Sequence, residues 1–185
     1  KANTIIKPKF GTDKYISGVG RSTMLLLKAF AKIDNMPFRI KLYASGLNSL
    51  GFHAATLPYE HFSFWLPQKI GTVMTSVEPY YICHFVKKDL IHIPHNFDVI
   101  NKKDKYTVTI HDTCLYDIAV NDGDKYMQDL WMKSAINSVG IMTCSECSKM
   151  DIIDRFKVRE DKVSVVPWGI STEIFHILDA KDIKP

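Results

Sequence analysis

Two kinds of hydrophobic pattern alternate along this chain. Residues 105–111 (KYTVTIH) form a short run rich in β-branched side chains, which predicts a strand. Residues 21–34 instead repeat large apolar side chains at helical spacing, which predicts a helix with one core-facing side, ended by Pro37. The predicted core positions of this helix are Leu26, Ala29, Phe30 and Ile33.

Further elements follow the same two patterns. Ser145 is expected to open one helix, because a serine oxygen at the N-cap accepts a hydrogen bond from an otherwise unpaired backbone N–H. Residues 44–76 carry several Gly, Pro and aromatic residues without a clear period, so we expect loops and short helices there. The remaining helices are predicted over residues 78–88, 124–139 and 145–156, and the remaining strands over residues 3–7, 38–43, 89–94, 140–144 and 162–166.

Strands that alternate with helices predict an α/β fold in one domain, residues 1–185. Such a pattern requires a doubly wound, mostly parallel sheet with helices on both faces. In these sheets, ligands bind outside the carboxyl ends of the strands. His111 follows the strand predicted over residues 105–111, and Gly18 and Gly20 lie in the loop before the first helix. We therefore expect these two features to face the same crevice.

Composition narrows the classes of function only slightly. Hydrophobic residues make up 46% and charged residues 24% of the chain, as in ordinary globular proteins. The net charge of +4, from 24 basic and 20 acidic residues, suits an acidic substrate or an anionic membrane surface but is too small to indicate nucleic-acid binding. No apolar run reaches transmembrane length and no signal peptide is visible, and the four cysteines are expected to be reduced thiols of a cytoplasmic protein.

The Gly-rich segment before the first helix is a candidate phosphate site. Gly18, Val19 and Gly20 would let the backbone approach a ligand, and the helix N-terminus offers free N–H groups to an anion. Arg21 could add a charge-assisted hydrogen bond. The alternative is a flexible turn with an N-cap. The motif alone favours that alternative, because it is neither a full dinucleotide fingerprint nor a Walker loop.

His111 and Asp112 form the second candidate site. An isolated pair of this kind is more often structural, with the histidine ending a strand and Asp112 starting an Asx-turn. The position at the carboxyl end of a predicted parallel strand favours a functional role.

Three other motifs have simpler interpretations. Residues 122–124 (DGD) resemble a metal-binding Asp-x-Asp but precede a helix, so a turn and cap are expected. Cys144 and Cys147 have redox spacing without further zinc ligands nearby. His92 and His95 have no third ligand in the sequence around them, so we expect no metal site.

Three stretches together resemble one known family. They are residues 17–30 (SGVGRSTMLLLKAF), the pair 89–97 and 106–117 (DLIHIPHNF and YTVTIHDTCLYD), and residues 141–175, which end in Val-Pro-x-Gly and a phenylalanine. In order and spacing they resemble the N-terminal domain of a GT-B glycosyltransferase of the large retaining family 4. The match spans most of the chain and is weakest over residues 44–78.

The resemblance implies a reaction and a set of roles. Such enzymes move a sugar from a nucleotide-sugar donor to an acceptor hydroxyl with retention and without a bound metal, so neither a cofactor nor a metal is expected. The family's Gly-rich loop lies near the donor diphosphate and the acceptor. Its strand-end histidine lies against the donor sugar; here that residue is His111, with Asp112 shaping the turn. The loop positions correspond to Gly18, Val19, Gly20 and Arg21.

The chain departs from the family's pattern in two respects. Trp168 replaces the usual asparagine of Val-Pro-Asn-Gly. Family members also carry two glutamates of fixed spacing and an Arg/Lys pair in a second, donor-binding domain, and no two glutamates here have that spacing. The resemblance therefore implies that the C-terminal donor-binding domain is absent from this chain, which would be inactive alone.

The expected function is the acceptor-side domain of a cytoplasmic glycosyltransferase in surface polysaccharide or glycolipid synthesis. Its partners would be a nucleotide-sugar, a saccharide or lipid-linked acceptor and the missing domain, with no nucleic acid. Aromatic residues at 61–65 would suit peripheral contact with the inner membrane face, although a packing cluster explains them better. The alternative is a stand-alone Rossmann-like nucleotide-binding or regulatory module; a dehydrogenase is disfavoured because no acid ends the strand over residues 38–43.

Overall fold

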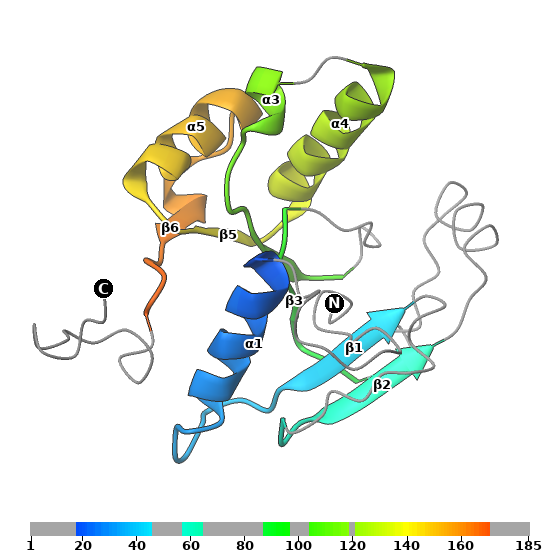
Figure 1. The fold of residues 1–185 in the computed structure, drawn as a ribbon, viewed down its shortest axis with the longest axis vertical. Coiled ribbons are helices and arrows are strands. Elements are labelled where there is room, and N and C mark those ends of the chain that lie inside the picture. Colours follow the sequence, from blue (N-terminus) through cyan, green and yellow to red (C-terminus); the bar gives the residue numbers. More distant parts are fainter. Residues whose placement is uncertain (1–17, 46–56, 65–86, 97–103, 119–120, 171–185) are drawn as a thin grey trace, which may run out of the picture.

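Parallel strands and helices make up the described part of the chain (Figure 1). The structure is a computed structural model and describes residues 18–45, 57–64, 87–96, 104–118 and 121–170. Its helices are α1 (Gly18–Phe30), α3 (Leu115–Ile118), α4 (Asp122–Asn137), α5 (Glu146–Phe156) and the 3-10 turn η5 (Glu160–Lys162). Its strands are β1 (Lys41–Ser45), β2 (Glu60–Phe64), β3 (Ile91–Ile93), β4 (Tyr106–Thr109), β5 (Gly140–Thr143) and β6 (Val163–Val165).

The main sheet of the described residues has four strands in the order β3-β4-β5-β6, and every neighbouring pair is parallel. β1 and β2 form a separate parallel pair. The predicted α/β class with a parallel sheet is therefore confirmed, and the arrangement is compatible with a Rossmann-like fold. The strand predicted over residues 3–7 lies outside the described residues.

Side chains of β4 alternate between the two faces of the main sheet, as the strand geometry requires. Tyr106, Val108 and the following Ile110 point into a hydrophobic core that α4 and α5 cover. Val108 and Ile110 are completely buried there. The Tyr106 hydroxyl donates to the Ser134 carbonyl of α4 at 2.9 Å, and burial raises the pKa of Tyr106 to about 12.

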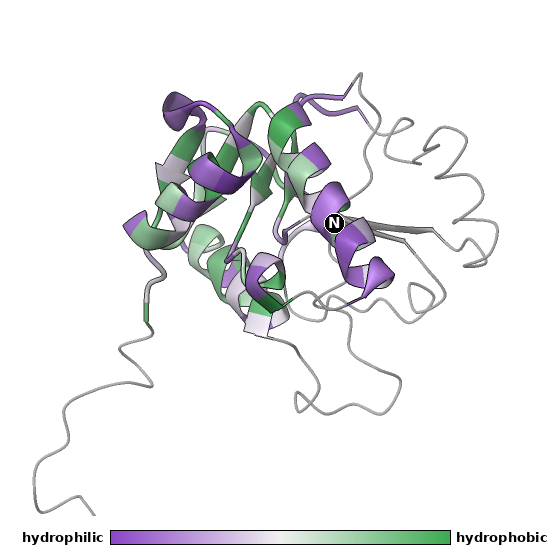
Figure 2. Ribbon diagram, turned by 90° about the horizontal axis from the view of Figure 1, so that it is seen from above, coloured by the Kyte–Doolittle hydropathy of each residue, from purple (hydrophilic) through white to green (hydrophobic). Residues whose placement is uncertain are grey.

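The opposite face of the sheet carries polar side chains and faces α1. Thr107 and Thr109 of β4 contact His92 of β3 on this face, and Thr109 lies in one pocket with residues of α1. Figure 1 shows α1 on one side of the sheet and α4 with α5 on the other. Figure 2 shows hydrophobic positions gathered along the strands and the helix sides next to them.

Two helix starts agree with the sequence. Ser145 is the N-cap of α5, and its hydroxyl accepts a hydrogen bond from the Ser148 N–H at 3.1 Å. Asn121 caps α4 in a capping box, in which Asn121 and Asp124 each accept a hydrogen bond from the other's backbone, at 3.1 and 3.2 Å. The interpretation of residues 122–124 is confirmed in part: Asp124 belongs to the cap, but the helix begins at Asp122, so these residues form its first turn instead of preceding it.

The first helix differs from the prediction in its start and in its buried face. α1 begins at Gly18, so the segment predicted as a loop forms the first helical turn, and the helix ends at Phe30. Its buried residues are Gly20, Thr23 and Leu27. The predicted core position Ile33 is 52% exposed and Ala29 is exposed. The buried face of this helix was predicted from large apolar residues alone, whereas small residues form much of the face that α1 buries.

Two more predictions need correction. β2 was not foreseen, because its short sequence EHFSF begins with a charged residue and lies in a segment without a clear period. Lys87 and Lys88, at the end of a predicted helix, are not helical; the rest of that helix lies outside the described residues. The predicted strands over 89–94, 105–111, 140–144 and 162–166 are confirmed in shorter form as β3 to β6. No helix in the described ranges is long and apolar enough to cross a membrane.

Ile152→Ala tests the core between α5 and the sheet. Ile152 is completely buried, so its truncation should lower the free energy of unfolding by about 2–5 kcal/mol. Ile136→Ala on α4 is the matched control, because Ile136 is 51% exposed, and its effect should stay within about 0.5 kcal/mol. Urea denaturation measures both. Equal losses in the two variants would contradict this description of the core.

Candidate functional site

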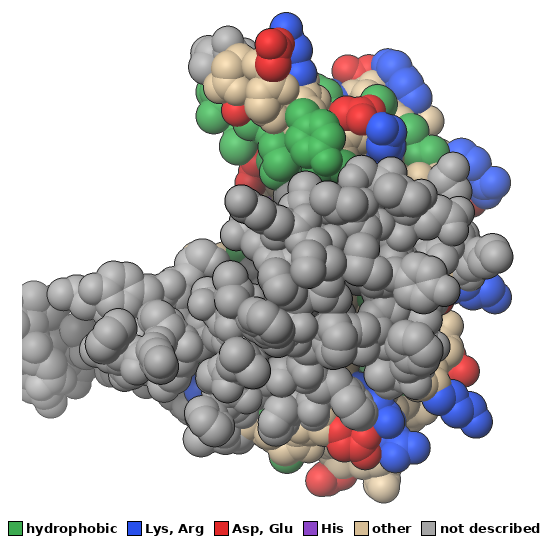
Figure 3. Space-filling view, turned by 90° about the vertical axis from the view of Figure 1, so that its right-hand side faces the viewer, with side chains coloured by type: hydrophobic (Ala, Val, Ile, Leu, Met, Phe, Trp, Pro, Cys, Tyr) green, Lys and Arg blue, Asp and Glu red, His purple; other side chains and the backbone are tan. Residues whose placement is uncertain are grey.

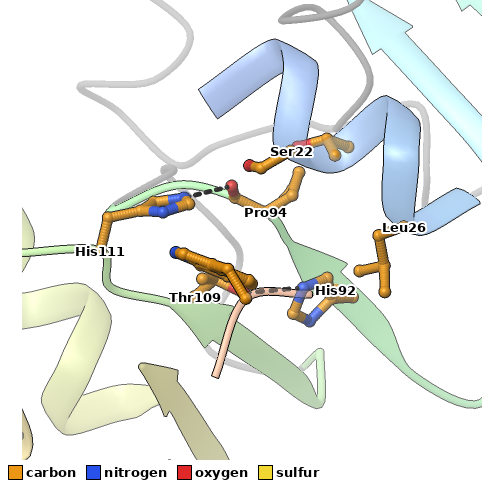
Figure 4. A pocket seen from close by; sticks show the side chains of 8 residues that line it. Ser22, Leu26, His92, Pro94, Thr109 and His111 are labelled. Carbon is orange, nitrogen blue, oxygen red and sulfur yellow. Dashed lines mark hydrogen bonds between the residues drawn. The ribbon is translucent and has the colours of Figure 1, made fainter. Parts of the chain in front are cut away.

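A small pocket lies at the carboxyl ends of β3 and β4, beneath α1 (Figure 4). Pro94 follows β3, His111 follows β4, and Trp168 comes from the segment after β6. Each of these residues lies beyond the end of a parallel strand, which is where ligands bind in open α/β sheets. The pocket is lined by Ser22, Thr23, Leu26, His92, Pro94, Thr109, His111 and Trp168.

The pocket is small, and none of its described lining residues is acidic, lysine or arginine. Its space for the centre of a water molecule is about 10 Å³, which is room for roughly one water. Sites that hold organic ligands are usually far larger. The pocket as it stands is therefore too small to enclose a whole sugar ring.

His111 is held by one hydrogen bond from its ring and by one aromatic contact. Its Nε2 lies 3.1 Å from the Pro94 carbonyl oxygen. Because a carbonyl only accepts, Nε2 must carry the proton. In the neutral ring Nδ1 is then an acceptor, and it has no hydrogen bond to a described residue. The ring also lies 5.2 Å from the Trp168 ring, with an angle of 35° between the planes.

Asp112 has the structural role that its sequence context favours. Its Oδ1 accepts a hydrogen bond from the Cys114 N–H at 3.1 Å, which is an Asx-turn. The side chain is exposed and does not line the pocket. Asp112 therefore shapes the turn that follows His111. The adjoining Cys114 thiol has a raised pKa, chiefly because it is hydrogen-bonded to the Asp112 carboxyl group.

His92 forms part of the pocket floor and is fixed by two threonines. Its Nδ1 lies 2.9 Å from Oγ1 of Thr107, and its Nε2 lies 3.1 Å from Oγ1 of Thr109. Burial lowers the pKa of His92 to about 4. Both ring nitrogens are thus engaged and the ring is neutral at pH 7. Among the described residues, no three His, Cys, Asp or Glu side chains are grouped so as to hold a metal ion.

The Gly-rich segment lies beside the pocket without lining it. Gly18, Val19, Gly20 and Arg21 form the first turn of α1, and Arg21 is exposed. The Val19 carbonyl accepts hydrogen bonds from the Ser22 and Thr23 hydroxyls, at 3.0 and 2.8 Å. The structure therefore brings α1 and His111 together, as expected, through the next turn of the helix. Phosphate binding by the first turn stays a prediction.

Two residues of the pocket were missed at the sequence level. His92 was considered only as a metal ligand. The alternation of side chains along the strands could have placed it on the same face as Thr107 and Thr109. Trp168 was noted only as a departure from the family's pattern. No local signal connects it to His111, because only the tertiary fold brings the two rings together.

Charges outside the pocket are mixed in sign. On the face shown in Figure 3, basic and acidic side chains lie near one another. Several basic residues form ion pairs, including Lys41 with Glu60 at 2.8 Å and Lys88 with Asp104 at 3.2 Å. The three described cysteines, Cys114, Cys144 and Cys147, are free.

The low pKa of His92 predicts how stability depends on pH. Below its ordinary pKa of 6.5, the unfolded chain binds a proton at His92 that the folded chain binds only near pH 4. Stability should therefore fall between about pH 6.5 and 4, by about 3 kcal/mol from this group. His92→Gln should remove that part of the pH dependence, as measured by urea denaturation across this range. An unchanged pH profile would mean that His92 titrates normally in the folded protein.

No family model matches the chain, and no curated protein matches it.

Proposed function

We propose that this chain is the N-terminal, acceptor-side domain of a metal-independent retaining glycosyltransferase of the GT-B type, family 4. The observation that carries the proposal is the uncharged, partly aromatic pocket at the carboxyl ends of β3 and β4, directly beside the N-terminal turns of α1. The reaction class is inferred from the order and spacing of the three stretches that resemble the family. The acceptor would be a saccharide or lipid-linked saccharide of a surface polysaccharide or glycolipid.

The chemistry of the pocket suits a sugar ring better than a phosphate group. No lysine or arginine is among the described residues that line it. A ring with apolar C–H faces and hydroxyl edges needs an aromatic surface and hydrogen-bonding groups. Trp168 supplies the aromatic surface, and His111 supplies an acceptor at Nδ1.

The first turn of α1 suits the diphosphate of a nucleotide-sugar. Its backbone N–H groups and the positive end of the helix attract an anion, and Arg21 is exposed next to them. A Cβ placed on Gly18 would meet no described atom within 4 Å, so the backbone there is open to a ligand. Sugar and diphosphate sites would thus adjoin each other along α1.

His111 would bind and orient the sugar rather than act as a general base. Its Nε2 proton is committed to the Pro94 carbonyl, which leaves one acceptor for a ligand hydroxyl. Asp112 would contribute only by shaping the turn that positions His111, since its carboxylate accepts a hydrogen bond from the Cys114 N–H. The small volume requires Trp168 to move as the ligand enters; its side chain has no hydrogen bond to a described residue that would resist this.

In this proposal, donor binding depends mainly on a second domain, as the family resemblance implies, and the active protein works in the cytoplasm or at the inner membrane face. The test is a transfer assay with the full-length gene product and a panel of uridine, guanosine, adenosine and cytidine sugar nucleotides. Transfer from one donor supports the proposal. Nucleotide binding without any transfer would favour a stand-alone nucleotide-binding or regulatory module instead.

His111→Ala should reduce transfer by the full-length product about 100-fold, because it removes a group that orients the reacting sugar. Its cost in stability should be about 2 kcal/mol, since one partly buried hydrogen bond and the ring contact with Trp168 are lost. Tyr126→Ala is the control, because Tyr126 is an aromatic residue of α4 that is 62% exposed. Unchanged turnover in His111→Ala would return this residue to a purely structural role.

Gly18→Ala separates a ligand-facing glycine from a merely structural one. The new methyl group meets no described atom within 4 Å, and alanine favours a helix, so stability should stay equal or rise slightly. If the backbone at Gly18 touches a diphosphate, affinity for the nucleotide-sugar should fall about tenfold or more, measured by calorimetry on the full-length product. Wild-type affinity in Gly18→Ala would exclude close approach at this position.

A further inference from the structure

We propose that Asn96 is a positioning residue, whose side-chain amide fixes the backbone of His111 and Asp112 so that the His111 ring keeps its proton on Nε2. The relevance of this role to catalysis rests on the proposed function, but the role itself can be tested without it. Asn96 belongs to the segment HIPHN, in which only a metal site had been considered.

The Asn96 amide contacts the turn at two points. Its Oδ1 accepts a hydrogen bond from the His111 N–H at 2.9 Å, and its Nδ2 donates to the Asp112 carbonyl at 3.2 Å. A donor and an acceptor on one planar group fix both the position and the orientation of the His111–Asp112 backbone. No other side chain of the described residues makes two hydrogen bonds to this backbone pair.

Asn96 takes the place of a missing strand neighbour. β4 pairs with β3 only as far as Val108, because β3 ends at Ile93. The Ile110 N–H still donates to the Met142 carbonyl on the β5 side, at 2.9 Å. Successive N–H groups of a strand point to opposite sides, so the His111 N–H points to the side where β3 has ended. The Asn96 oxygen supplies the acceptor that the sheet no longer provides.

The same segment also holds the His111 ring. Pro94 lies two positions before Asn96, and its carbonyl accepts the Nε2 proton of His111 at 3.1 Å. Three hydrogen bonds therefore join residues 94–96 to residues 111–112. With the backbone fixed by Asn96, Nε2 stays within reach of the Pro94 oxygen. The neutral ring then presents Nδ1 to a ligand as an acceptor, which suits a hydroxyl group.

The direct test is the tautomer of His111 in nitrogen-15 NMR of the labelled chain, at a pH at which the ring is neutral. His111 is assigned by its loss in His111→Gln. In the wild-type chain we expect separate shifts for a protonated Nε2 and an unprotonated Nδ1. In Asn96→Ala both shifts should move toward each other, as the two tautomers mix, and the His111 amide proton should exchange faster with solvent.

Two further variants make the test specific. Asn96→Asp keeps the acceptor for the His111 N–H but replaces the donor to the Asp112 carbonyl with an oxygen, so the His111 amide should exchange more slowly than in Asn96→Ala while the two tautomers mix in part. Asn137→Ala, at the exposed end of α4, should change neither signal. The proposal is overturned by mixed tautomers in the wild-type chain, by a wild-type pattern in Asn96→Ala, or by His111 amide exchange in Asn96→Asp as fast as in Asn96→Ala. If Asn96→Ala does not fold, mixed tautomers in the wild-type chain or a wild-type pattern in Asn96→Asp overturns it.

Activity separates this inference from the proposed function. In the full-length product, Asn96→Ala should lower kcat about tenfold, and Asn96→Asp should lower it less. If Asn96→Ala changes the tautomer but the wild-type product transfers no sugar, the positioning role is supported and the proposed function is contradicted. If the wild-type product transfers sugar but Asn96→Ala leaves the tautomer unchanged, the proposed function is supported and the positioning role is contradicted.

Discussion

Side chains of β4 alternate between the hydrophobic core and the polar face of the sheet. Tyr106 and Val108 point to one face of the sheet, where α4 and α5 bury them in a hydrophobic core. Thr107 and Thr109 point to the other face and hold the buried ring of His92. Because successive residues of a strand must face opposite ways, one short segment builds both the stable core and the polar floor of the pocket.

At the carboxyl end of the sheet, strands of unequal length leave backbone groups without hydrogen-bond partners from a neighbouring strand. Side chains supply these partners. Asn96 bonds the backbone of His111 and Asp112, and Arg155 of α5 donates to the Thr113 carbonyl at 3.2 Å and forms an ion pair with Asp117 at 2.7 Å. The turn after β4 is thereby tied to both α5 and the segment that follows β3, which gives His111 a defined position beside the pocket.

The pocket is narrow, and one aromatic contact occupies part of its mouth. The rings of His111 and Trp168 lie against each other, so the space that would receive a ligand ring is partly filled by the protein's own indole. Ring contacts of this kind contribute about 1 kcal/mol, which a ligand with a comparable C–H face can replace.

The features predicted from the sequence are local ones. β3 to β6, the Ser145 cap and the Asx-turn at Asp112 depend on residues a few positions apart, so the residue types of near neighbours are enough to predict them. Three features follow only from the packing of distant segments: which face of α1 is buried, the pairing of residues 60–64 with β1, and the contacts of Asn96 and Trp168 with His111. These contacts join residues far apart in the chain, and local propensity carries no information about which distant group will satisfy a backbone N–H or cover a ring.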